Sequence, residues 1–280
     1  MPDIDDINVQ LDKEIDELLG IQRVYKKTIL VLSGGGLKGI TQLGCLEALK
    51  QQGHLKYIDT IAGTSAGAIV ATLYIAGYQP TELYDFLVKF DISKMTYAKT
   101  VNMLEKYGLD DGKRCMIILE RLIKAKKFDA DITFREFYKR TKIKLIITGT
   151  CLNEKKAHYF SVDTQPDMSV LIAVRISVSI PIIFAPYKFE NNLFVDGGCI
   201  DNYPIQLFKD KLDRVIGVYV CDKNEPVEKI ENIEDFLLSL IHCLFEGVNH
   251  NSSKGYEKFT IKINVLSFLF SLCISSQQFE

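Results

Sequence analysis

The sequence of 280 residues lacks several features that would indicate particular classes of protein. Its seven cysteines are scattered and never stand in C-x-x-C spacing, which argues against a disulfide framework and against a zinc site. The net charge is −2, from 34 basic and 36 acidic residues, so no overall field attracts nucleic acid. We therefore expect reduced thiols, no bound metal and no nucleic-acid partner.

A secretory signal and a long hydrophobic run are also missing. The first ten residues, MPDIDDINVQ, are acidic and have no apolar core. Residues 265–275 form the longest apolar run near an end, about half of the ~20 residues that a transmembrane helix needs. We expect a cytoplasmic protein in which this run forms a buried terminal helix or, as the alternative, a helix in the membrane interface.

Strands and helices are predicted to alternate along the chain. Apolar runs predict strands at 28–32, 57–62, 144–148, 156–160, 193–195 and 214–220. Helical periodicity predicts helices at 37–52, 65–77, 81–90, 112–126, 133–140, 166–177 and 233–245. Such alternation is typical of a mainly parallel sheet with helices on both faces.

The chain is predicted to form one domain, because no repeat, low-complexity tract or Gly/Ser linker divides it. Residues 1–27 are expected to be an N-terminal arm, since apolar residues recur there at spacings of three and four between acids. Residues 28–207 would form the main body, and residues 208–280 the C-terminal strands and helices of the same domain.

The first predicted strand leads into a glycine-rich loop. Gly34, Gly36 and Gly39 spell G-x-G-x-x-G before a predicted helix, the pattern of a dinucleotide-binding loop. Such a loop needs an acid at the carboxyl end of the second strand. The nearby acid, Asp59, precedes the apolar part of that strand and falls at the wrong end. The sequence therefore argues against a nucleotide cofactor.

The second predicted strand leads instead into Gly63-Thr64-Ser65-Ala66-Gly67, a G-x-S-x-G motif. At a nucleophile elbow the chain turns so sharply that small residues must surround the serine, as they do around Ser65. Loops after adjacent parallel strands face the same crevice. The backbone N–H groups of Gly34, Gly35 and Gly36 are therefore interpreted as holding the oxyanion that forms when Ser65 attacks an ester.

A serine nucleophile needs a base, and none of the four histidines is well placed to serve. They are His54, His158, His242 and His250. Asp196 follows a predicted strand and precedes Gly197 and Gly198, which clear space beside it. An aspartate with a pKa near ~3.9 is a weak base for an alcohol. We therefore predict a dry pocket that raises the pKa of Asp196 and a direct hydrogen bond to Ser65.

Taken in order, the segments GGGLKG, GTSAG and DGG resemble the motifs of the patatin-like phospholipase family. The segment VRISVSIPIIFAPY at 174–187 is similar to the family's serine-rich stretch, and the resemblance spans 28–205. It implies a three-layer α/β/α fold and calcium-independent hydrolysis of lipid acyl esters without a cofactor. The nucleophile would be Ser65 and the base Asp196.

The resemblance also assigns supporting residues. It makes Gly34, Gly35 and Gly36 the oxyanion-hole loop, and it places Lys38 where the family has arginine or lysine, in a supporting or phosphate-binding position. The remaining motif residues are Gly39, Gly63, Gly67, Gly197 and Gly198.

A lipid substrate would require contact with a membrane or lipid aggregate. A basic stretch from Lys124 to Lys144, interleaved with aromatic residues, would suit anionic phospholipid or form a solvated helix face. Residues 88–97 would form an apolar lid or pack on the body. Neutral glycerides, lysolipids and acyl-thioesters stay open as substrates of a hydrolase or transacylase, as do a protein activator and a catalytically silent lipid-binding role.

Overall fold

The computed structural model describes residues 26–91, 94, 106–223, 229–231 and 233–266. Residues 1–25 of the predicted arm, half of the predicted lid at 88–97 and nearly all of the apolar run at 265–275 lie outside these residues. Within the described residues, no helix is both long enough and apolar enough to cross a bilayer.

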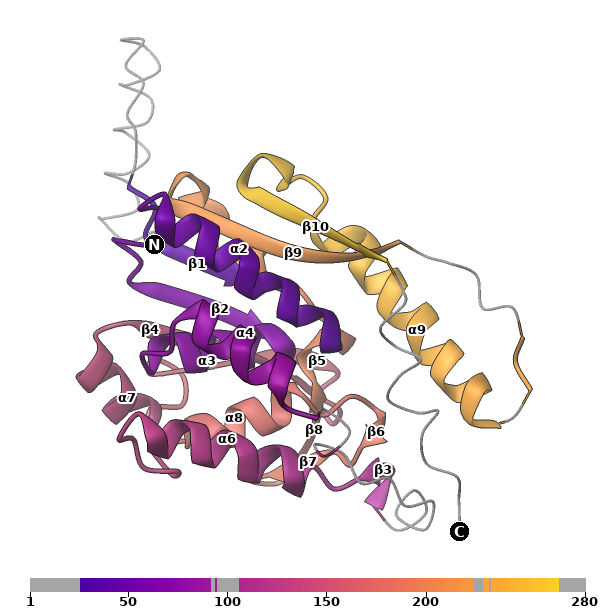
Figure 1. The fold of residues 1–280 in the computed structure, drawn as a ribbon. Coiled ribbons are helices and arrows are strands. Elements are labelled where there is room, and N and C mark those ends of the chain that lie inside the picture. Colours follow the sequence, from indigo (N-terminus) through magenta and orange to yellow (C-terminus); the bar gives the residue numbers. More distant parts are fainter. Residues whose placement is uncertain (1–25, 92–93, 95–105, 224–228, 232, 267–280) are drawn as a thin grey trace, which may run out of the picture.

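The central sheet has eight strands in the order β10-β9-β1-β2-β4-β8-β7, with β5 also paired to β4 (Figure 1). The strands are β1 (Ile29–Leu32), β2 (Thr60–Thr64), β4 (Lys144–Cys151), β5 (Lys156–Ser161), β7 (Tyr187–Phe189), β8 (Asn192–Asp196), β9 (Val215–Lys223) and β10 (Thr260–Leu266). Five of them, β10, β9, β1, β2 and β4, run parallel, whereas β5, β8 and β7 add antiparallel pairs. The prediction of a mainly parallel sheet is confirmed.

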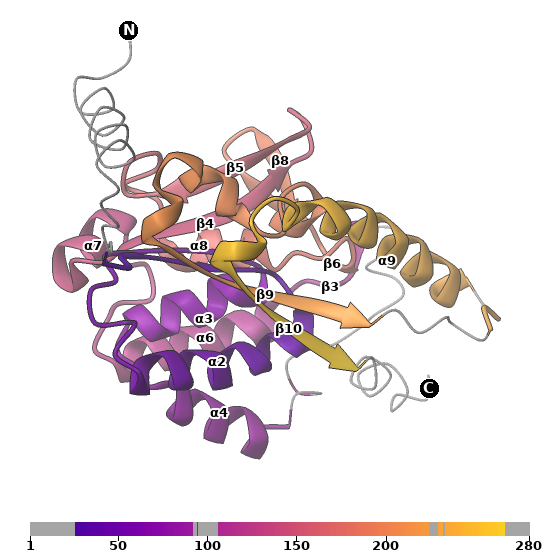
Figure 2. The ribbon, with the colours of Figure 1, turned by 90° about the horizontal axis from the view of Figure 1, so that it is seen from above.

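Helices cover both faces of the sheet (Figure 2). The helical elements are α2 (Ile40–Gln51), α3 (Ala66–Ile75), α4 (Pro80–Lys89), α6 (Lys113–Ala125), α7 (Phe134–Thr141), α8 (Val170–Ser177), α9 (Ile233–Ser252) and the 3-10 helices η1 (Gly36–Gly39), η3 (Gly197–Cys199), η4 (Pro204–Arg214) and η5 (Glu257–Phe259). Side chains alternate along β1, so that Leu30 and Leu32 pack in the larger core with α2 and α3, while Ile29 and Val31 pack in a smaller core with η4.

The structure corrects several predicted boundaries. The second strand begins at Thr60 rather than at 57, because it pairs in register with β1, whose first residue, Ile29, lies opposite Thr60. Helix α8 begins at Val170 rather than at 166, since the backbone before it accepts hydrogen bonds from the start of α7. Residues 265–266, predicted as helical, end strand β10.

Other elements had no predicted counterpart. Strands β3 (Gly108–Asp110) and β6 (Ile182–Phe184) pair in a small second sheet. Strands β7 and β10 and the 3-10 helix η4 were also not predicted, and α9 extends to Ser252, so that His250 lies in a helix rather than in a loop. Strands of three residues carry too little periodicity to be recognised from sequence.

Candidate active site

Ser65 stands at the turn between β2 and α3, as the motif predicted. Its backbone has φ 53° and ψ −120°, a conformation that residues other than glycine rarely adopt and that costs about 1–3 kcal/mol. The motif glycines permit this turn, since a Cβ on Gly63 would lie 2.6 Å from the carbonyl oxygen of Gly67. A Cβ on Gly67 would lie 2.6 Å from the carbonyl oxygens of Leu32 and Ser33. The side chain of Ser65 is 6% exposed.

The glycine loop follows β1 and lies against the serine turn. A Cβ on Gly34 would come within 3.3 Å of Cβ of Ser65, and a Cβ on Gly39 within 2.5 Å of Cβ of Ala66. The N–H group of Gly34 already donates to the carbonyl oxygen of Asn202, at 2.9 Å. Of the predicted oxyanion loop, Gly35 and Gly36 therefore stay as the candidate donors.

Asp196 lies at the same edge of the sheet, although the strand that it ends is antiparallel to its neighbour β4. Strand β4 extends three residues past Thr148, which pairs with Thr64 at the end of β2. Strand β8 is antiparallel to β4 and contacts it only along this extension, with Asp196 opposite Gly149, while β7 pairs with the other side of β8. A Cβ on Gly197 would lie 2.5 Å from the carbonyl oxygen of Thr148, so only glycine permits this close approach. The candidate base and the candidate nucleophile thus each lie one residue beyond the Thr64–Thr148 pair.

The carboxyl group of Asp196 is 1% exposed, and burial raises its pKa to about 7. Hydrogen bonds from the Ser65 side chain and from the N–H of Gly198, the latter 2.7 Å from Oδ1, oppose this rise. Among the described residues, Oδ2 has no partner with full hydrogen-bond geometry. We therefore interpret the Ser65 contact as the loose one that is common before substrate binds. The raised pKa suits a general base at neutral pH.

Sequence reasoning missed the residues that hold the two catalytic candidates in place. The N–H of Ser65 donates to Oγ of Ser177 at 2.8 Å, and the N–H of Asp196 donates to the carbonyl oxygen of Ser179 at 2.9 Å. Ser177 ends α8, and both serines are fully buried. The serine-rich segment was the available signal, and the structure shows that it contacts both Ser65 and Asp196.

The loop residue Ser33 and the buried side chain of Lys38 also support this edge. Oγ of Ser33 accepts a hydrogen bond from the N–H of Val220, at 2.9 Å, and so ties the glycine loop to β9. The side chain of Lys38 is 6% exposed, which fits a supporting role in the loop better than contact with a lipid head group.

The histidines are placed elsewhere, so far as their side chains are described. His54 is exposed beyond the end of α2, and His242 is exposed on α9. Nε2 of His158 lies 3.1 Å from Oε2 of Glu154, next to the β4–β5 turn. The expectation that carboxylate rather than imidazole serves as base is consistent with these positions.

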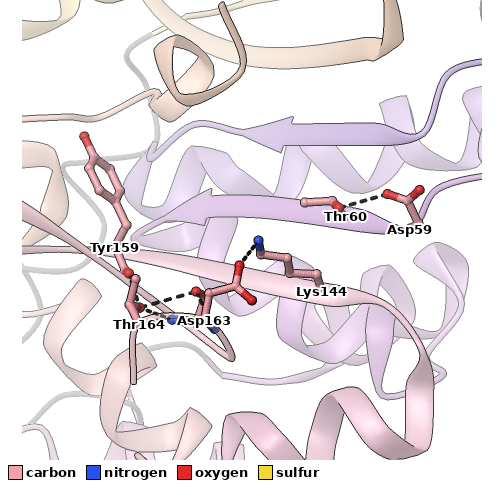
Figure 3. A network of polar contacts seen from close by, with 7 residues as sticks. Asp59, Thr60, Lys144, Tyr159, Asp163 and Thr164 are labelled. Carbon is pink, nitrogen blue, oxygen red and sulfur yellow. Dashed lines mark hydrogen bonds and ion pairs between the residues drawn. The ribbon is translucent and has the colours of Figure 1, made fainter. Parts of the chain in front are cut away.

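The amino-terminal edge of the sheet holds Asp59, as the argument against a nucleotide requires. Figure 3 shows Asp59 and Thr60 at the start of β2 beside Lys144 at the start of β4, where Lys144 pairs with Asp163. Ser65 follows the opposite end of β2. An acid at this edge cannot hold a ribose beside the glycine loop.

The basic stretch from Lys124 to Lys144 ends at this same amino-terminal edge. Three of its four aromatic residues are buried, with Phe128 at 7%, Phe134 at 2% and Phe137 at 1% exposure, whereas Tyr138 is 41% exposed. Several of its cations have partners. They are Lys124 with Glu120, Lys126 with Glu82, Arg135 with Asp167, and Arg140, which stacks on Phe128 and donates to the carbonyl oxygen of Lys127. The solvated-face interpretation is therefore favoured over an anionic lipid site.

One group of side chains among the described residues has the chemistry of metal ligands. The ligand atoms of Cys151, Glu154 and His158 lie within 4.8 Å of one another. The carboxylate of Glu154 is already engaged by His158 and by Nζ of Lys156, at 2.6 Å, and Cys151 is fully buried. A cation beside Lys156 would be repelled, so these residues fit an ion-pair network better than a metal site.

Comparison with known proteins places the chain in a family. The family model "Patatin-like phospholipase" matches residues 30–209. An uncharacterised protein, R571 of Acanthamoeba polyphaga mimivirus, is 33% identical over 270 residues, covering 89% of this chain and 88% of that protein. The probable lipid hydrolase 463L of Invertebrate iridescent virus 6 is 35% identical over 189 residues, covering 65% of this chain and 63% of that protein.

The fold has counterparts among solved structures. VipD from Legionella pneumophila aligns with a TM-score of 0.58 at 17% identity, over 86% of this chain and 62% of that one. The likeness supports the α/β fold, and the family match covers the glycine loop, the G-x-S-x-G turn and Asp196 together. The chain belongs to the patatin-like phospholipase family.

Proposed function

We propose that the protein hydrolyses fatty-acyl esters of glycerophospholipids through Ser65 and Asp196, without calcium. Family membership supports lipid acyl hydrolase activity in general. The observation that carries the finer proposal is that Ser65, the glycine loop and a buried Asp196 with a raised pKa converge at one edge of the sheet.

In the first half of the reaction, Oγ of Ser65 attacks the acyl carbonyl carbon while Asp196 takes the hydroxyl proton. The N–H groups of Gly35, Gly36 and Ala66 hold the oxyanion, each worth on the order of 3 kcal/mol in the transition state. When the tetrahedral intermediate collapses, the lysophospholipid alcohol leaves with the proton from Asp196. An acyl ester on Ser65 remains.

In the second half, water attacks the acyl-enzyme and Asp196 takes a proton from it. Collapse of this intermediate releases the fatty acid and returns the proton to Oγ of Ser65. Polarisation of the carbonyl comes from backbone N–H groups and proton transfer from Asp196, so no step of this mechanism requires a calcium ion.

The direct test is release of fatty acid from phosphatidylcholine vesicles in the presence of a calcium chelator. We expect release at the same rate with chelator and with added calcium. A panel of triglyceride, lysophospholipid and acyl-thioester, assayed with the same protein, would establish the preferred leaving group. Release that stops on chelation would contradict the mechanism, and a folded protein without activity on any of these esters would favour a binding role.

Ser177 is predicted to be a positioning residue. Removing its hydroxyl with Ser177→Ala leaves the buried N–H of Ser65 without its acceptor, at a strained turn that depends on such contacts. We expect kcat to fall about tenfold to hundredfold while KM changes about twofold or less. The rate of covalent reaction of Ser65 with a fluorophosphonate probe should fall in parallel.

Ser161→Ala is the matched control for this prediction. Ser161 is also buried, at 3% exposure, and its hydroxyl also accepts a backbone N–H, that of Asp163. Ser161 ends strand β5, where it lies opposite Ile146 of β4. This position is away from the carboxyl edge of the sheet, which bears Ser65. Both variants should lose thermal stability, but only Ser177→Ala should lose kcat. If Ser177→Ala and Ser161→Ala had the same kcat, Ser177 would have a purely structural role.

A further inference from the structure

Helix α9 carries a row of exposed large hydrophobic side chains that no contact described so far explains. Ile233, Phe236, Leu240 and Leu244, which we call the α9 stripe, are 67%, 50%, 45% and 64% exposed. Their spacings of three and four place them on one face of the helix. The neighbouring face packs on the body through Ile241, which is 7% exposed. The apolar arc of α9 is therefore wider than the face that is buried.

The carboxyl-terminal half of the same helix reaches the active site. A Cβ on Gly198, two residues after Asp196, would lie 2.8 Å from Cε1 of Phe245. Oδ1 of Asn249 accepts a hydrogen bond from Nδ2 of Asn202 at 2.7 Å, and Asn202 in turn accepts the N–H of Gly34 through its carbonyl oxygen. One helix thus joins the stripe to the glycine loop and to the residues beside the base.

The other end of α9 extends away from the sheet. Figures 1 and 2 both show its first turns projecting beyond the body, while its last turns lie against it. The last turns are fixed to β9 by a hydrogen bond from the hydroxyl of Tyr219 to the carbonyl oxygen of Asn249, at 2.9 Å. The stripe is therefore held at a fixed position relative to Ser65.

The charges of α9 indicate which surface the stripe fits. The helix contains no lysine or arginine, and its charged residues are Glu234, Asp235 and Glu246. Attraction to anionic head groups would require cations, so such a helix gains its binding free energy from apolar insertion alone. The basic residues between Lys124 and Lys144 lie toward the opposite edge of the sheet.

We propose that the α9 stripe docks the enzyme on a zwitterionic phospholipid surface and thereby presents Ser65 to the lipid. The inference rests on the proposed function, because a lipid surface at this edge is what supplies a phospholipid ester to the nucleophile. The four apolar side chains would insert at the boundary between the lipid head groups and the acyl chains. This insertion removes them from water, which makes the free energy of binding favourable.

The test compares the double variant Leu240→Glu/Leu244→Glu with the control Leu207→Glu. Leu207 is 39% exposed on η4, which leads into the start of β9 and so toward the opposite edge. Binding to phosphatidylcholine vesicles is measured by co-sedimentation in the Ser65→Ala background, which keeps the lipid intact. We expect the double variant to lose at least about tenfold in partitioning, and the control less than about twofold.

Activity separates this inference from the proposed function. Hydrolysis of a monomeric short-chain ester should be unchanged in the double variant, while hydrolysis of phosphatidylcholine vesicles should fall at least about tenfold. Wild-type protein that cleaves neither substrate would count against the proposed function. A different result is that the wild type cleaves both substrates while the double variant binds and cleaves vesicles as well as the wild type does. That result would overturn the docking surface and leave the proposed function standing.

Three further results would each overturn the proposal. Vesicle binding that is lost at high salt would show that cations rather than the stripe carry it. A large drop in Tm of the double variant, with unchanged vesicle binding, would show that the stripe packs against another part of this chain. A dimer that dissociates in the double variant would identify a second copy as the occupant.

Discussion

Replacing Ser65 with alanine is expected to lower kcat for fatty-acid release by at least about 10⁴-fold. The attacking oxygen is then absent, and neither the oxyanion donors nor Asp196 supply another nucleophile. Covalent labelling by a fluorophosphonate should disappear in the same variant. The comparison requires phospholipid vesicles as substrate and a circular-dichroism spectrum that shows the variant to be folded.

Ser65→Gly distinguishes loss of the nucleophile from loss of the fold. Because the backbone at this position has φ 53° and ψ −120°, glycine relieves a strain of about 1–3 kcal/mol that alanine retains. We expect both variants to be inactive and the glycine variant to unfold at the higher temperature. Residual release in Ser65→Ala above about 1% of the wild-type rate would contradict the assignment of the nucleophile.

The second large effect concerns Asp196. Asp196→Asn keeps the shape of the side chain but removes its ability to take a proton, so we expect kcat to fall about 10³- to 10⁴-fold.

The same role of Asp196 predicts a pH dependence of the wild type, because its carboxyl group must be ionised before it can accept the proton of Ser65. Because burial raises the pKa of Asp196 to about 7, kcat/KM should rise with pH and level off above about pH 7.

The pH profile has a clear contradicting outcome. A carboxyl with its ordinary pKa of 3.8 would give activity that is already maximal near pH 5. Such a profile would show that Asp196 is not held in a dry environment, or that another group limits the rate. The measurement uses a monomeric ester, so that changes in lipid surfaces with pH do not enter.

Thermal stability gives an independent reading of the same carboxyl. Its pKa is higher in the folded chain than the value of 3.8 expected when unfolded, so the folded state binds more protons between these values. The stability of the wild type that depends on this group is therefore greatest below about pH 4 and is lost as pH rises through about 7. Asp196→Asn should unfold at a higher temperature than the wild type at pH 8, and this difference should shrink on acidification.

The sequence by itself determined the class of the fold and identified the candidate residues of the site. Spacing alone placed Ser65 between a strand and a helix and Gly34 to Gly36 in the loop after the preceding strand. These motifs are local, because a sharp turn imposes small residues within a few positions of itself. The alternation of apolar periods is local in the same sense, and it predicted the mainly parallel sheet.

Only the tertiary structure decided how the two catalytic candidates meet. The sequence placed Asp196 at the end of a strand, but it did not reveal that this strand is antiparallel to β4 and meets β4 only along its extension beyond Thr148. It also did not reveal that Ser177 and Ser179 accept the backbone N–H groups of Ser65 and Asp196. Strand direction and such contacts depend on pairings between residues far apart in the chain, and no local period encodes them.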